Sequence, residues 1–128
     1  MKYTFIISAL LLIGCGGEGG NSAPTPVVAA PDTTNPVIGF EPSSIELPSM
    51  TRESVILTAT DNEALASPPI VTCTLGVSFK DDIVRTPEVE ATQMSTCTAT
   101  VSDTSGNNSK AYLYVTIKPL DTADCTGC

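Results

Sequence analysis

The chain of 128 residues contains no histidine and no tryptophan, and it carries only 6 Lys and Arg against 14 Asp and Glu. Without histidine it lacks Ser-His and Cys-His nucleophile pairs and imidazole ligands for zinc. Aromatic residues make up 5% of the chain, too few for most stacking platforms that grip sugars or bases. The net charge of −8 opposes contact with nucleic-acid phosphates. We therefore expect no catalytic residues, no cofactor and no nucleic-acid partner.

The sequence also lacks an apolar run long enough to span a bilayer as a helix, which needs roughly 20 residues. The apolar segment at residues 5–13 (FIISALLLI) has only nine residues. It follows the positive charge of Lys2 and ends at Gly14, an arrangement typical of a secretory signal. Residues 1–14 are therefore predicted to be a signal peptide rather than a permanent transmembrane anchor.

The end of this signal has a specific pattern, Leu12-Ile13-Gly14-Cys15. It resembles the lipobox of bacterial lipoproteins, in which the cysteine becomes the new amino terminus and carries diacylglycerol and an N-acyl chain. The resemblance implies membrane lipid as a partner through Cys15, since several acyl chains hold a protein to a membrane. Gly16 after the cysteine implies delivery to the outer membrane of the bacterial cell envelope. The alternative is an ordinary signal peptide with a cysteine there by chance.

Cys15 is followed by a stretch without hydrophobic periodicity. Residues 15–35 are dense in Gly, Pro, Ala, Ser and Thr, a composition that predicts a flexible linker. About twenty such residues reach roughly 25 Å on average. Their fully extended limit is about 65 Å. The linker would hold a folded domain away from the lipid surface.

After the linker, the chain carries only strand signals separated by turn residues. No amphipathic helix is evident, so residues 36–119 are predicted to form one all-β domain, followed by a tail at 120–128. The expected strands are 37–47 with a break at Pro42, 54–60, 70–75, 77–80, 83–85, 88–94 and a closing hairpin at 97–117. About seven strands is the number found in an immunoglobulin-like β-sandwich.

The closing hairpin has the clearest pattern. Alternation predicts that Cys97, Ala99 and Val101 face inward in its first arm. In its second arm the predicted inward residues, opposite two tyrosines and a threonine, are Ala111, Leu113, Val115 and Ile117. The two arms are joined by a turn rich in Asp, Ser, Gly and Asn.

Four segments carry a family resemblance in their order and spacing: DTTNPVIGF at 32–40, TATDNEA at 58–64, IVTCT at 70–74 and CTATVSDTSGNNSKAYLYVTI at 97–117. Together they resemble a hyalin-repeat (HYR) or related bacterial immunoglobulin-like domain. The resemblance is weak over residues 76–92. Where the family often has a cysteine pair, this chain has Phe40 and Ala111. The resemblance implies an immunoglobulin-like fold and names no ligand.

Four cysteines remain after Cys15. In the fold implied by the resemblance, Cys73 and Cys97 occupy inward positions of neighbouring strands, so we expect a disulfide between them. Cys125 and Cys128 have the spacing of redox and metal motifs, but no thioredoxin-like setting or further soft ligand accompanies them. We expect them to be disulfide-bonded, either to each other or between molecules.

Acidic and amide residues in two loops offer oxygen ligands: Asp61, Asn62, Glu63 and Asp103. Calcium takes six to eight oxygens, and the sequence has no EF-hand-like loop. The simpler interpretation is turn chemistry, with Asp103 accepting backbone hydrogen bonds and Gly106 or Asn107 at positive φ. We therefore expect no metal site.

These observations predict a membrane-anchored, extracytoplasmic immunoglobulin-like lipoprotein that acts as a binding, adhesion or envelope-structural module. Its partner would be a protein or a surface polymer. The alternative is an accessory subunit that positions the catalytic partner in a secreted or envelope enzyme complex.

Overall fold

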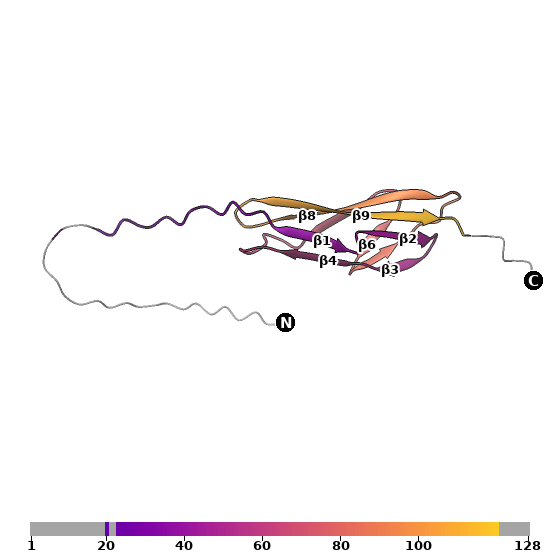
Figure 1. Cartoon of the computed structure of the whole chain (residues 1–128), viewed down its shortest axis with the longest axis horizontal. Coiled ribbons are helices and arrows are strands. Elements are labelled where there is room, and N and C mark those ends of the chain that lie inside the picture. The colour runs from indigo at the N-terminus through magenta and orange to yellow at the C-terminus, as the bar shows by residue number, and fades with distance from the viewer. Residues whose placement is uncertain (1–19, 21–22, 121–128) are drawn as a thin grey trace, which may run out of the picture.

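The computed structural model describes residue 20 and residues 23–120 of the chain. Residues 23–36 carry no strand and lead away from one end of the folded domain (Figure 1). The nine strands are β1 (Val37–Glu41), β2 (Ser44–Pro48), β3 (Arg52–Ser54), β4 (Ile56–Thr60), β5 (Ile70–Cys73), β6 (Ser78–Lys80), β7 (Ile83–Arg85), β8 (Gln93–Ser102) and β9 (Asn108–Lys118). The described residues include no helix that could cross a membrane. The predicted all-β class is confirmed.

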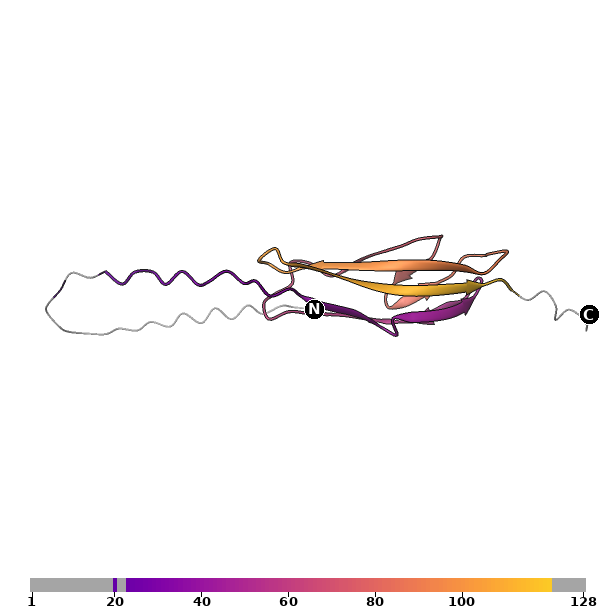
Figure 2. The ribbon, with the colours of Figure 1, turned by 45° about the horizontal axis from the view of Figure 1, so that its top comes forward.

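The strands form two layers, which separate clearly in Figure 2. One layer is a four-stranded sheet in the order β2-β9-β8-β5. The other layer contains the antiparallel pair β1-β4 and the sheet β3-β7-β6, which are linked because only Val55 separates β3 from β4. The domain is therefore a β-sandwich with the architecture of immunoglobulin-like folds.

The first predicted strand is divided between the two layers. β1 pairs antiparallel with β4, whereas β2 pairs parallel with β9, so the chain changes layer between Glu41 and Ser44. The peptide bond between Glu41 and Pro42 is cis, and the carbonyl of Ser43 accepts a hydrogen bond from the backbone N–H of Tyr114 at 3.0 Å. Pro42 therefore lies where the strand breaks, as expected of a residue that cannot donate to a ladder.

The core follows the alternation predicted for the closing hairpin. Its first arm buries Cys97, Ala99 and Val101, and its second arm is most deeply buried from Leu113 onward. From the opposite layer, the core residues are Phe40, Val55, Val77 and Val84. The rings of Phe40 and Phe79 meet edge to face at 5.5 Å. Because both layers contribute alternate side chains, the hydrophobic interior lies between the two sheets.

Several other predicted strands differ from the structure. Residues 54–60 were expected to form one strand, but Val55 donates its N–H to the carbonyl of Asp82 and separates β3 from β4. The predicted strand at 88–94 is wrong, because residues 86–92 are irregular and β8 begins at Gln93. Here the buried hydroxyl of Ser49 accepts the N–H of Val89 at 3.1 Å, replacing a ladder hydrogen bond.

The strand predicted at 70–75 is also shorter than expected. β5 ends at Cys73, and Leu75 lies in a turn with φ of 52° and is 52% exposed. Gly76 follows at φ of 71°, so two successive residues adopt the left-handed conformation that reverses the chain. Val77, directly after the turn, is buried in the core.

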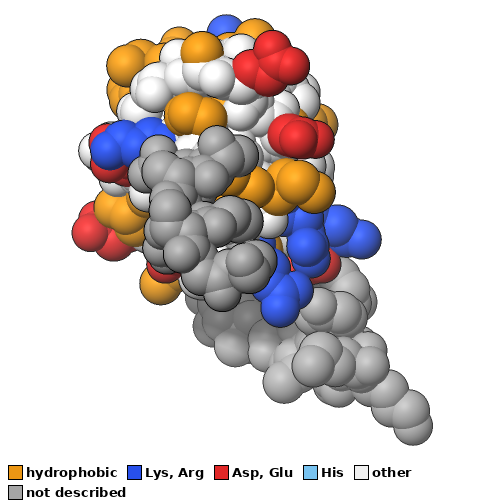
Figure 3. Space-filling view, turned by 90° about the vertical axis from the view of Figure 1, so that its right-hand side faces the viewer, with side chains coloured by type: hydrophobic (Ala, Val, Ile, Leu, Met, Phe, Trp, Pro, Cys, Tyr) orange, Lys and Arg blue, Asp and Glu red, His pale blue; other side chains and the backbone are white. Residues whose placement is uncertain are grey.

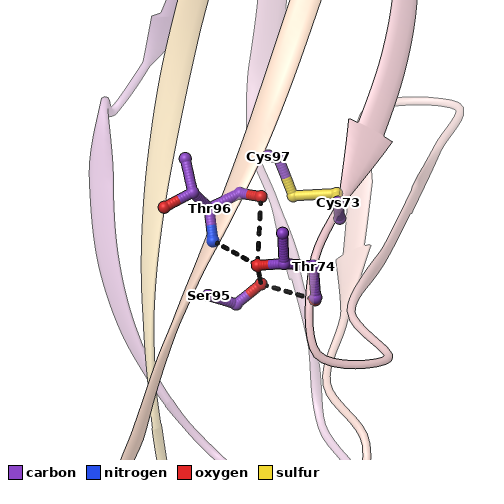
Figure 4. Close-up of a disulfide and its surroundings, with 5 residues drawn as sticks. All are labelled: Cys73, Thr74, Ser95, Thr96 and Cys97. Atoms are coloured by element: carbon purple, nitrogen blue, oxygen red, sulfur yellow. Dashed lines mark hydrogen bonds between the residues drawn. A yellow bond between two sulfur atoms is a disulfide. The ribbon is translucent and has the colours of Figure 1, made fainter.

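A disulfide joins Cys73 of β5 to Cys97 of β8, the pair expected from the sequence (Figure 4). The two residues lie directly opposite each other in the antiparallel pair. Beside the bridge, Thr74 donates its N–H to the carbonyl of Thr96, and the Ser95 hydroxyl donates to the carbonyl of Thr74 at 2.7 Å. The bridge and these hydrogen bonds hold β5 to the centre of its sheet.

Candidate functional site

Three aspartates meet at the end of the sandwich where residues 23–36 join it. Asp32 lies in that segment, Asp61 directly follows β4, and Asp103 directly follows β8. Each offers a carboxylate oxygen, and these three oxygens lie within 4.8 Å of one another. We call this group the aspartate cluster.

The pairing of strands explains why residues so distant in sequence meet. Val37 at the start of β1 lies opposite Thr60 at the end of β4, so Asp32 and Asp61 extend from the same end of that pair. An isolated bridge joins Leu65 to Asp103 and holds the loop after β4 against the turn between β8 and β9. The topology therefore gathers the three carboxylates without any local sequence motif.

Asp103 is the most buried member of the cluster, with 2% of its surface exposed. Its Oδ1 accepts the backbone N–H of Asn107 at 2.8 Å, and its Oδ2 accepts the Asn107 side-chain Nδ2–H at 2.7 Å. Gly106 adopts a φ of 91°. The predicted turn chemistry is therefore confirmed, with Asp103 as the acceptor and Gly106 as the residue at positive φ.

Asn107 also connects the turn to the segment before β1. Its Nδ2 donates to the carbonyl oxygen of Asp32 at 3.1 Å. The Oδ1 of Asp32 accepts the N–H of Thr34 at 2.9 Å, and this hydrogen bond is the main reason that the pKa of the Asp32 carboxyl lies below its usual value. The nearby Asn62 side chain acts in the same direction. Asp32 is therefore held in its charged form.

Two oxygens of the cluster have no hydrogen-bond partner. The Oδ2 of Asp32 and the Oδ1 of Asp61 are buried from solvent and accept no hydrogen bond from the described residues. Among the described residues the only ion pair joins Lys118 to Glu46. No described Lys or Arg therefore neutralises the three carboxylates. Carboxylate oxygens without other partners are the ligands that hard divalent cations prefer.

The cluster includes two of the four loop residues singled out in the sequence. Asp61 and Asp103 lie together, whereas Glu63 turns away, and its Oε2 accepts the hydroxyl of Ser105 at 2.9 Å. Asp32 was not recognised as a ligand from the sequence. The signal that could have found it is the antiparallel pairing of β1 with β4, which places the residues before Val37 beside those after Thr60.

The opposite end of the sandwich carries a groove, with a volume of about 640 Å³. It is lined by Met50, Thr51, Arg52, Arg85, Thr86, Pro87 and Glu88. This end is fixed by backbone hydrogen bonds from Ser49 to Lys118 and from Met50 to Pro87. Figure 3 views this end of the molecule and shows Lys and Arg side chains beside hydrophobic ones. We call this feature the arginine groove.

Arg52 and Arg85 lie directly opposite each other in the β3-β7 pair, and both are exposed. Like charges at opposite positions destabilise a strand pair unless a counter-charge is present. Neither residue forms an ion pair with any other described residue. The groove therefore presents two free guanidinium groups, whose planar donors match carboxylates.

The tyrosines of the closing hairpin and the cysteines are distributed as follows. Tyr112 and Tyr114 are about half exposed on the outer face of β9, opposite Thr98 and Thr96 of β8. Cys73 and Cys97 form the structural disulfide. Three cysteines of the sequence lie outside the described residues: Cys15, Cys125 and Cys128.

The described residues thus define a β-sandwich domain with an acidic cluster at the end where residues 23–36 join it and an arginine-lined groove at the other. Comparison with protein-family models found no match, and a search of curated proteins found no significant match.

Proposed function

We propose that this protein is a lipid-anchored module of the bacterial cell envelope, attached to the outer membrane, that acts by binding a partner rather than by chemistry. The observation that carries the proposal is that the linker segment (residues 23–36) and the arginine groove lie at opposite ends of the sandwich. β9 has 11 residues, and at about 3.4 Å per residue it spans about 35 Å between these ends. A domain anchored through its linker would present the groove away from the membrane.

The charge of the groove indicates what kind of partner it would bind. The whole chain has only 6 Lys and Arg, and two of them face each other in this groove. Arginine forms bidentate hydrogen bonds with carboxylates, and exposed arginines are enriched where proteins bind one another. The proposed partner is a surface protein or polymer that presents carboxylate groups. Contact of this kind suits adhesion or an envelope-structural role.

The anchoring half of the proposal is tested with Cys15→Ser. We expect the variant to leave the membrane fraction and to lack the mass of the acyl chains, because the substituted residue has no thiol to accept lipid. The measurement is cell fractionation with mass spectrometry of the purified chain. Cys125→Ser is the matched control and should remain in the membrane fraction. Membrane retention and an unchanged mass in Cys15→Ser would contradict lipid anchoring.

The contact half is tested by photo-crosslinking on intact cells. A photoreactive amino acid replaces Met50, which lines the arginine groove and is 66% exposed. The control places it at Val37, which is 70% exposed near the other end. We expect crosslinked partners from position 50 that decrease at least tenfold when Arg52→Glu and Arg85→Glu are added. Equal crosslinking from both positions, or no dependence on the arginines, would contradict the groove as the contact surface.

A further inference from the structure

We propose that Asp32, Asp61 and Asp103 bind one calcium ion where the linker segment joins the sandwich. Three carboxylates lie together there without a cationic partner among the described residues. Like charges this close together repel one another. A bound divalent cation would remove this repulsion.

The spacing of the cluster fits a single ion. Calcium binds oxygen ligands at 2.3 to 2.6 Å, so two oxygens on opposite sides of one ion are about 4.8 Å apart. The three carboxylate oxygens lie within 4.8 Å of one another. They can therefore contact one calcium ion with little movement of the backbone.

A second, independent observation points to a ligand. The Oδ2 of Asp32 and the Oδ1 of Asp61 are buried and accept no hydrogen bond. A buried polar atom without a partner is costly, because it has lost its hydration without compensation. Both side chains are otherwise partly exposed, so the shielded oxygens are those turned toward the protein. Metal coordination would satisfy them.

The ligand set favours calcium over magnesium. Each of the three carboxylates offers at least one oxygen, and water molecules can complete the six to eight ligands that calcium accepts in irregular geometry. Magnesium requires a near-ideal octahedron, keeps several of its waters and is usually held by only one or two carboxylates. A site formed by three carboxylates from three separate segments suits the larger and less demanding ion.

The site would also fix the direction in which the linker leaves the domain. Asp61 and Asp103 belong to loops of the sandwich, whereas Asp32 lies five residues before β1. Without the ion, the segment is attached at this position through the hydrogen bond from Asn107 to the carbonyl of Asp32. With the ion, two carboxylates of the domain would hold the side chain of Asp32 as well. The calcium site does not depend on the proposed membrane anchor. If the chain is anchored, a fixed linker direction would also orient the domain relative to the membrane.

The experiment is calcium titration of the purified full chain in detergent, after treatment with a chelator. Calorimetry should give one ion per chain with a Kd of about 1 mM or tighter, the range of extracellular calcium modules. About 10 mM calcium should raise the Tm by roughly 6 °C or more, whereas magnesium should raise it much less. The absence of binding heat and of a Tm shift at that concentration would overturn the proposal. An equal Tm shift with magnesium would overturn the assignment to calcium.

Variants of the same chain test which residues bind the ion. Asp32→Asn and Asp61→Asn should each weaken the Kd at least tenfold while retaining the fold, since neither residue lies in a strand. The matched control is Asp81→Asn, which removes one charge from an exposed turn at φ of 53°, a conformation that asparagine tolerates. Its Kd should be unchanged. Equal affinity in Asp61→Asn and Asp81→Asn would overturn the site. Because these measurements use purified protein, they are independent of the crosslinking and fractionation results.

Discussion

Replacing Cys73 and Cys97 together with alanine is expected to lower the free energy of unfolding by about 3 to 4 kcal/mol. The bridge spans a sequence separation of 24 residues, and opening it restores the freedom of that loop in the unfolded chain. A loss of this size is a large share of the stability of a small domain. The measurement is urea denaturation without reductant, with the transition midpoint and slope fitted for each chain.

The control for this prediction makes the same two Cys→Ala changes at other positions in the chain. Cys125→Ala with Cys128→Ala also removes two cysteines, from the part of the chain that the structure does not describe. We expect this variant to keep a free energy of unfolding within about 1 kcal/mol of the parent chain, because the sequence predicts that both residues belong to a tail after the domain. If the two double variants unfolded at the same urea concentration, the Cys73–Cys97 bridge would not be the main covalent constraint on the sandwich.

Leu113→Ala is expected to cost about 2 to 5 kcal/mol, because it removes a fully buried side chain and leaves a cavity. Leu113 lies in β9 opposite Cys97, at the centre of the four-stranded sheet. The same denaturation measurement applies. Its matched control is the neighbouring Tyr112→Ala, since Tyr112 is 48% exposed on the outer face of the same strand. Equal losses in the two variants would contradict the assignment of inner and outer faces along β9.

The parts of the fold that follow from local pattern were predictable from the sequence. Alternation in the closing hairpin correctly gave the inward residues of β8 and β9, because one face of each strand is buried and the other is not. The pairing of Cys73 with Cys97 followed from the fold that the resemblance implied. A period of two is strong evidence only where burial differs between the two faces.

The parts that were wrong depend on contacts distant in sequence. The strand predicted at 88–94 has suitable residues. However, the backbone N–H of Val89 donates to the hydroxyl of Ser49, 40 positions earlier, instead of to a neighbouring strand. The separation of β3 from β4 depends on the carbonyl of Asp82. Hydrogen bonds of this kind have no signature in the segment that they alter, so propensity and alternation alone would not reveal them.

The candidate site was only partly predictable for the same reason. Asp61 and Asp103 stood out as oxygen ligands in loops, together with Asn62 and Glu63, whereas Asp32 did not. Asp32 joins them because β1 and β4 run antiparallel, with Val37 opposite Thr60. The groove at the other end arises likewise from register, which places Arg52 opposite Arg85. Both features require knowledge of which strands are neighbours.

The parallel pairing of β2 with β9 has a mechanical consequence. β2 lies near the start of the domain and β9 ends it, and they are joined over five residue pairs, from Ser44 with Tyr114 to Pro48 with Lys118. A pulling force between the segment before β1 and the end of β9 would act along these strands in opposite directions. The hydrogen bonds between them would then be loaded together in shear rather than opened one at a time. The sandwich is thus arranged to resist tension along its long axis.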